Sequence, residues 1–192
     1  MIPQLGYALL LLTFGLALYA SAMSVLGYLR NRPEWMESAR KAALLSFPLL
    51  SLTALLLIYL LVSGDFSVDY VASASSRAMP LYLRVTALWG GQAGSLLFWC
   101  WLMSAFSSAV MLRDWKRDRE FLPWVVVVTM VTLAFFVSLV AFVENPFQRL
   151  WQTTGGEVVT RMFAPLNAIL YQPADGRGLN PLLRHPGMII HP

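Results

Sequence analysis

Four long runs without any charged side chain limit what this sequence can fold into; they cover residues 5–29, 42–64, 92–112 and 121–143. About 20 apolar residues in a helix cross a hydrocarbon core of about 30 Å, so each run is long enough to span a bilayer. In lipid, only helices and closed barrels satisfy every backbone hydrogen bond. The runs therefore predict an all-α membrane protein with about four transmembrane helices. The composition agrees, because 58% of the residues are hydrophobic and 12% are charged.

The basic residues between these runs predict how the chain crosses the membrane. Two short loops hold most of them, with Arg30, Arg32, Arg40 and Lys41 in one and Arg113, Lys116, Arg117 and Arg119 in the other. Cytoplasmic loops carry an excess of Lys and Arg. We therefore expect a four-helix transmembrane domain over residues 1–143 and an extracytoplasmic tail over residues 144–192, with both the N-terminus and the C-terminus extracytoplasmic.

Several classes of function are excluded by the same pattern. The net charge of +4 comes from clusters between apolar runs, which indicates topology and no nucleic-acid partner. The runs contain no Asp, Glu, His, Lys or Arg, the usual markers of ion paths in pumps and channels. The single cysteine, Cys100, excludes an internal disulfide and a cysteine zinc site, and we expect it to serve packing.

Two segments outside the runs have their own expected structures. Residues 65–84 are rich in serine and carry Asp65, Asp69 and Pro80, which is typical of a solvent-facing loop. Between residues 158 and 170, apolar residues recur at helical spacing, and Glu157 lies four residues before Arg161. This pattern predicts an amphipathic helix on the membrane surface, interrupted by a proline at position 165.

A glycine-rich segment at the start of the third run is a candidate cofactor-binding site, and its residues are Trp89, Gly90, Gly91, Gly94 and Ser95. Glycines allow another backbone or a flat ligand to approach closely. The same residues are also typical of a tight turn and a helix start, with tryptophans in the aromatic belt at the membrane interface. From the residues alone, both interpretations stay open.

The end of the chain holds a candidate metal ligand, His191, which follows the apolar residues Met188, Ile189 and Ile190. A neutral imidazole is a good axial ligand for haem iron, and an apolar neighbourhood suits the edge of a porphyrin. The alternative is a histidine in a loop at the membrane interface, with no ligand role. His185 lies nearer to polar residues and is the weaker candidate.

Three segments, residues 88–99, 144–147 and 178–192, occur in an order that resembles the N-terminal part of the CcmF (also NrfE, CycK) family of cytochrome c maturation haem lyases. The resemblance runs from the first apolar run to the last residue. Three motifs in register are much more specific than any one of them. Residues 151–175 look longer than the usual connection between the second and third motifs.

The resemblance implies a multi-pass subunit in the plasma (inner) membrane that takes haem from a haem chaperone. The haem is joined to the Cys-x-x-Cys-His motif of apocytochrome c, which a thiol-handling partner delivers, on the extracytoplasmic side. His191 stands where the family has an external histidine proposed to ligate haem iron. The glycine-rich segment, Trp89 to Ser95, would then contact the haem.

The same resemblance implies that the chain is not active alone. The family continues into many more helices, a tryptophan-rich loop and further histidines, which this sequence lacks. We therefore expect the remaining C-terminal part of the haem lyase as a separate chain that shares the haem. The alternative is a non-enzymatic membrane assembly subunit that binds no haem.

Overall fold

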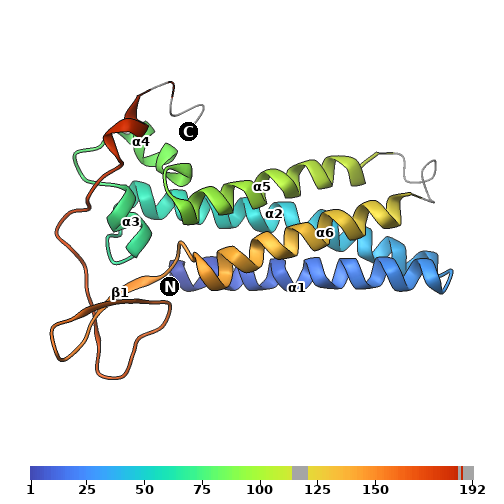
Figure 1. Ribbon diagram of the computed structural model, residues 1–192, viewed down its shortest axis with the longest axis horizontal. Helices are drawn as coiled ribbons and strands as arrows, with labels where there is room; N and C mark the ends of the chain where they lie inside the picture. Colours follow the sequence, from blue (N-terminus) through green and yellow to red (C-terminus); the bar gives the residue numbers. More distant parts are fainter. Residues whose placement is uncertain (114–120, 186, 188–192) are drawn as a thin grey trace. The chain divides into compact units, whose positions relative to one another are not determined.

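The computed structural model describes residues 1–113, 121–185 and 187. Within them, four helical segments are long and apolar enough to cross a membrane (Figure 1). They are α1 (Ile2–Leu29), α2 (Pro33–Ser63), α5 (Gln92–Met111) and the segment Leu122–Val143, which consists of α6 (Leu122–Ser138) and the π-helical turn η2 (Leu139–Val143). The prediction of four helical spans from the uncharged runs is confirmed.

The second helix begins earlier than the sequence predicted. Residues 30–41 were expected to form a polar loop, but α2 starts at Pro33, so only three residues separate it from α1. Proline is well suited to a first helical position, because the N–H that it lacks would have no partner there. Asn31 makes the turn with a positive φ of 51°. Inside α2, Glu37 accepts two hydrogen bonds of 2.8 Å from the Arg40 guanidinium, which allows charged residues to extend the helix.

The chain divides into two compact units. The mixed unit contains Met1–Tyr7, Ala54–Phe98 and the described residues from Glu144 onward, and the helical unit contains Ala8–Thr53 and Trp99–Val143. The division of the sequence at residue 143 into a transmembrane domain and a tail stays a prediction.

The helical unit is held together by apolar packing and a few hydrogen bonds between helices. Ser24 of α1 donates a hydrogen bond of 2.8 Å to the carbonyl oxygen of Pro123 in α6. The indole N–H of Trp101 in α5 donates to the hydroxyl of Ser51 in α2 at 3.0 Å. Cys100 is buried, as expected for a packing residue. Polar contacts of this kind are found between transmembrane helices, where no water competes for them.

The mixed unit corrects the prediction for residues 65–84. This segment was expected to be a solvent-facing loop, but it contains α3 (Asp69–Ala74) and most of α4 (Leu81–Thr86), and the 3₁₀ turn η1 (Ala87–Trp89) follows it. Phe66, Val68 and Val71 are buried in it, each at most 1% exposed. Its apolar residues are interspersed with serines, so the sequence shows no long apolar run. The helical turns nevertheless bring these apolar residues to one side.

The second correction concerns the predicted amphipathic helix over residues 157–170. The structure has strands there: β1 (Arg149–Gln152) is the centre of an antiparallel sheet, with β2 (Val158–Arg161) on one side and β3 (Ile169–Leu170) on the other. Val158, Val159 and Thr160 are β-branched and favour strands. Pro165 has no N–H to donate within a helix, and Asn167 has a positive φ of 58°. These residues prevent a continuous helix.

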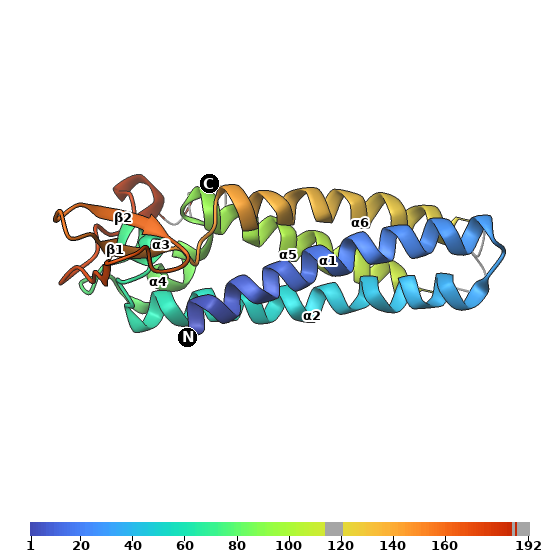
Figure 2. The same cartoon turned by 90° about the horizontal axis from the view of Figure 1, so that it is seen from below.

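The sheet packs beside the short helices of the same unit (Figure 2). The backbone N–H of Leu150 in β1 donates to the carbonyl oxygen of Ser67 at 2.8 Å, and that of Asp69 donates to the carbonyl oxygen of Gln148 at 3.0 Å. Further along, the N–H groups of Arg177 and Gly178 donate to the carbonyl oxygens of Ala72 and Ser75. The chain after the sheet therefore supplies partners for carbonyl groups at the end of α3, which would otherwise lack them.

Candidate functional site

The segment from Trp89 to Ser95 forms a tight connection between η1 and α5. The N–H of Gly90 donates to the carbonyl oxygen of Ala87 at 3.2 Å, and α5 begins at Gln92. The hydroxyl of Ser95 donates to the carbonyl oxygen of Trp89 at 2.8 Å. The ring of Trp89 lies 5.3 Å from that of Phe98, centre to centre. Trp89 and Ser95 are thus brought together by the turn and the first helical turn of α5.

Two of the three glycines make room for the side chain of Tyr70, which comes from α3. A methyl group on Gly94 would overlap the carbonyl oxygen of Leu88 and the hydroxyl of Tyr70, and it would lie 2.7 Å from the ring atom Cζ. A methyl group on Gly91 would lie 3.0 Å from Tyr70 Cε2. The close approach that the glycines were expected to permit is therefore made by a residue of the chain itself.

Tyr70 is buried and its hydroxyl has defined partners. It donates to the carbonyl oxygen of Ala87 at 2.8 Å and lies 3.2 Å from that of Leu88. Burial raises the pKa of Tyr70 above its usual range, and hydrogen bonds with the backbone of Gly91 and Gly94 offset only part of this shift. The residue therefore stays a neutral phenol and joins α3 to the turn before α5.

The third glycine, Gly90, is the contact point between two of the sequence motifs. A methyl group on Gly90 would overlap Cδ1 of Leu179, which is 3% exposed. The N–H of Leu179 lies 3.4 Å from the sulfur of Met79, and the guanidinium of Arg184 donates to the Leu179 carbonyl oxygen at 3.0 Å. The glycine-rich motif thus seats the third motif, which begins at Gly178.

The second motif, residues 144–147, packs in the same unit against the first helix. Phe147 is fully buried, and its ring fills the space next to Gly6, where a methyl group would overlap Cε1. The side-chain oxygen of Asn145 accepts a hydrogen bond of 2.9 Å from the N–H of Phe147. All three motifs therefore contribute buried side chains or close contacts to the mixed unit.

Of the two histidines, the structure describes only His185. His191, the predicted axial ligand, lies outside the described residues. His185 is exposed, and its Nδ1 accepts a hydrogen bond of 3.2 Å from the N–H of Gly187. No group of three or more His, Cys, Asp or Glu that could hold a metal ion occurs in the part of the chain that the structure describes.

A haem would not fit directly against the three glycines in this structure. Tyr70 fills the space at Gly91 and Gly94, and Leu179 fills the space at Gly90. Ser95 uses its hydroxyl for the contact with Trp89. What the segment presents outward is the partly exposed Trp89, paired with Phe98. Cofactor binding by Trp89, Gly90, Gly91, Gly94 and Ser95 stays a prediction, and Trp89 is the residue of this set with exposed aromatic surface.

Membership of a family follows from comparison with known proteins. The sequence model described as "Cytochrome C assembly protein" matches residues 89–192, which is more than half of the chain and includes all three motifs except residue 88. The chain belongs to this family.

Within this family, the chain matches the N-terminal portion of the CcmF, NrfE and CycK proteins. It is 34% identical over 192 residues to the "Cytochrome c-type biogenesis protein CcmF" of Escherichia coli (strain K12), covering 100% of this chain and 27% of that protein. It is 30% identical over 192 residues to the "Cytochrome c-type biogenesis protein NrfE" of Haemophilus influenzae, again with 100% and 27% covered. The chain thus spans about a quarter of the length of the curated relatives it matches.

A solved structure supports the fold. The chain superposes on a "Cytochrome c Heme Lyase CcmF" with a TM-score of 0.70 and 24% identity, over 77% of this chain and 25% of that chain. With four helical segments long and apolar enough to cross a membrane, and with this fold, the chain is a multi-pass membrane protein.

Tyr70, Met79 and Leu179 are residues of this region that the sequence did not single out. Three glycines within five positions did predict a close approach. Their partner could not be identified, because Tyr70 lies about twenty residues earlier in a serine-rich segment. The one sequence feature that could have pointed to Tyr70 is its place beside the apolar residues Phe66, Val68 and Val71. That feature indicates burial only when the segment is known to be helical.

Proposed function

We propose that this chain forms the N-terminal part of a cytochrome c maturation haem lyase in the plasma (inner) membrane. In this proposal, it acts with a separate chain that carries the rest of the family's sequence. The observation that carries the proposal is the convergence of the family's three motifs in the mixed unit, where Gly90 contacts Leu179.

We place the part of the mixed unit that lies outside the helical spans on the extracytoplasmic side. The support is the basic cluster around the α1–α2 connection, which favours the cytoplasm. Arg30 and Arg32 lie between the two helices, and Arg40 and Lys41 lie near the start of α2. Lys116, Arg117 and Arg119 of the other basic loop lie outside the described residues and support the same orientation by sequence alone. Haem attachment on the extracytoplasmic side needs the mixed unit there.

The chain's own residues would hold the start of the third motif, residues 178–184, in place. Leu179 is buried against Gly90, and Arg184 is tied back to the Leu179 carbonyl oxygen. The seven residues from Arg184 to His191 reach at most about 25 Å when fully extended. The anchor therefore restricts where His191 could donate an imidazole nitrogen to haem iron. Thioether formation itself would be the chemistry of the haem vinyl groups and of the apocytochrome thiols.

The test is to co-express the chain with a polypeptide holding the rest of the family's sequence and to measure the haem absorbance of the purified complex. We expect His191→Ala to lower haem content and cytochrome c maturation at least about tenfold, because it removes an axial ligand. Added imidazole should restore part of the haem spectrum. His185→Ala is the matched control and should leave both unchanged. Wild-type haem content and maturation in His191→Ala would refute the ligand assignment.

One observation favours the alternative, a membrane assembly subunit that binds no haem. The three glycines of the candidate cofactor site are covered by Tyr70 and Leu179, so they serve the fold whether or not haem is present. Under this alternative, the purified complex would contain no haem that depends on His191, yet deleting the chain would still abolish assembly of its partner. The same spectra therefore separate the two functions.

A further inference from the structure

Two connections of the small sheet differ sharply in chemistry. The β1–β2 connection, residues 153–157, is Thr, Thr, Gly, Gly and Glu, and it turns through Gly156 with a φ of 82°. The β2–β3 connection and β3 form a nine-residue stretch, residues 162–170, with no charged side chain. We refer to residues 162–170 as the apolar loop. Both connections join strands of the same sheet, so they differ in the polarity of their residues and not in the kind of structure that they link.

The apolar loop is exposed in the structure. The exposed fraction is 64% for Phe163, 94% for Leu166 and 68% for Ile169. Contiguous exposed apolar side chains of this kind mark a surface that meets something other than water. Proteins of the membrane interface use such side chains, above all aromatic and leucine residues, to enter the boundary between headgroups and acyl chains.

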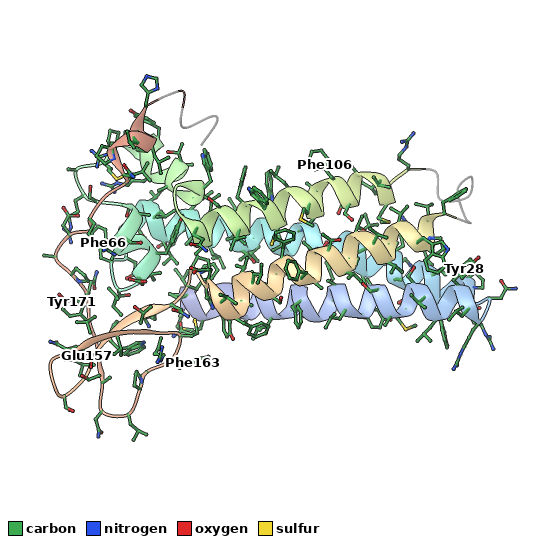
Figure 3. All side chains as sticks on the ribbon, viewed as in Figure 1. Tyr28, Phe66, Phe106, Glu157, Phe163 and Tyr171 are labelled. Atoms are coloured by element: carbon green, nitrogen blue, oxygen red, sulfur yellow. The ribbon has the colours of Figure 1, made fainter. Side chains whose placement is uncertain are left out.

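A contact within the mixed unit fixes the depth of this loop relative to α1. The ring of Phe163 packs edge to face against Tyr7, with 6.2 Å between the ring centres. Figure 3 shows Phe163 on the side of the sheet that lies toward the start of α1, whereas Glu157 lies away from it. Phe163 is therefore at about the level of Tyr7 along the first helix.

The length of α1 places Tyr7 near the membrane boundary. The helix has 28 residues, which at about 1.5 Å per residue give about 42 Å. The hydrocarbon core is about 30 Å thick, so about 6 Å of helix would extend beyond it at each end. Tyr7 lies five residues after Ile2, about 7.5 Å along the helix axis. This is the depth at which interfacial tyrosines are enriched.

We propose that the apolar loop dips into the lipid interface beside the start of α1, with Phe163, Leu166 and Ile169 in contact with lipid. Arg161, which immediately precedes the loop and is exposed, is suited to the phosphate groups at the boundary. The sheet then rests on the bilayer through one connection while its polar connection stays in water. This inference requires only that α1 spans the membrane, and it holds whether or not the chain handles haem.

Site-specific fluorescence quenching tests this placement. Cys100 is the only cysteine, so a Cys100→Ala background accepts single cysteines at Leu166 and, as the matched control, at Glu157, each labelled with the fluorophore NBD. Both positions are exposed, so labelling should not disturb the core. The labelled chains are reconstituted in phosphatidylcholine nanodiscs containing lipid that is spin-labelled near the headgroup.

We expect the lipid quencher to reduce the emission at Leu166→Cys at least about twofold more than at Glu157→Cys, and iodide in the water to show the opposite preference. Equal quenching by iodide at both positions would mean that the loop faces water. Protection of Leu166→Cys from both quenchers would mean that protein covers it. Either of these two results would overturn the proposal.

Discussion

The helical unit and the mixed unit satisfy their polar groups in different ways. In the helical unit, the hydroxyls of Thr13 and Ser21 each donate to the carbonyl oxygen four residues earlier, both at 2.8 Å. In the mixed unit, the N–H of Arg77 donates at 2.8 Å to Asp175, which is 98 residues away. The first pattern is available to any helix, whereas the second exists only when distant segments meet. In the helical unit, side chains such as Ser24 and Trp101 make the bonds of the second kind, whereas in the mixed unit backbone N–H groups make them as well. The mixed unit should therefore be the part that single substitutions can disrupt.

The largest effect that would test this contrast is expected at Gly94. In Gly94→Ala, the new methyl group would overlap the Leu88 carbonyl oxygen and the Tyr70 hydroxyl, so the turn before α5 must move. We expect a loss of about 3 kcal/mol in unfolding free energy, at the upper end of overpacking effects, measured by thermal unfolding of the reconstituted chain.

The control for this substitution is Gly15→Ala in the helical unit. Apart from its chain neighbours and the backbone of its own helix, no atom lies within 4 Å of a methyl group added at Gly15, and alanine favours helix by up to about 1 kcal/mol relative to glycine. The control should therefore unfold at the same temperature as the unsubstituted chain or slightly higher. Equal melting of both variants would show that the mixed unit is no more sensitive than the helical unit.

A smaller effect is expected at Arg84, which holds three backbone carbonyl groups of the mixed unit. Its guanidinium donates to the carbonyl oxygens of Met79 and Val62 at 3.1 Å and to that of Arg77 at 2.6 Å. Arg84→Met keeps the aliphatic stem but leaves these groups without their charged donor, which should cost about 2 kcal/mol. Arg177→Met, at an exposed arginine of the same unit, should change the melting temperature little; comparable losses in both variants would argue against the Arg84 contacts.

The smallest effect concerns the bond between helices in the helical unit. Ser24→Ala removes the 2.8 Å bond to the Pro123 carbonyl oxygen, and bonds of this kind between membrane helices contribute about 0.6 kcal/mol on average. Thr13→Val, which removes a bond within α1, should cost less, because it affects no neighbouring helix. If Ser24→Ala destabilised the chain as much as Gly94→Ala, the mixed unit would not be the more sensitive of the two units to single substitutions.

The sequence predicted the helical spans because hydrophobicity and length are local properties. It predicted the spans at α5 and at Leu122–Val143 to within one residue at each end. It was wrong about residues 157–170, where apolar spacing fitted a helix although Val158, Val159, Pro165 and Asn167 did not. It was wrong about residues 65–84 for a related reason, since burial of Phe66 and Tyr70 depends on chain that follows much later. The candidate site was predicted as a close approach, but Tyr70 and Leu179 as the approaching residues were not.

The contact between Gly6 and Phe147 has a consequence for how the chain is made. The two residues are 141 positions apart in the sequence. At a synthesis rate of about 5–20 residues per second, the first turn of α1 would wait roughly 7–28 s for the ring that finally packs against it. During that interval the other helices of the chain are still emerging from the ribosome. The bare surface at Gly6 is therefore open to lipid or to a membrane insertion factor before it is open to Phe147, and α1 must be stable in the bilayer without its last partner.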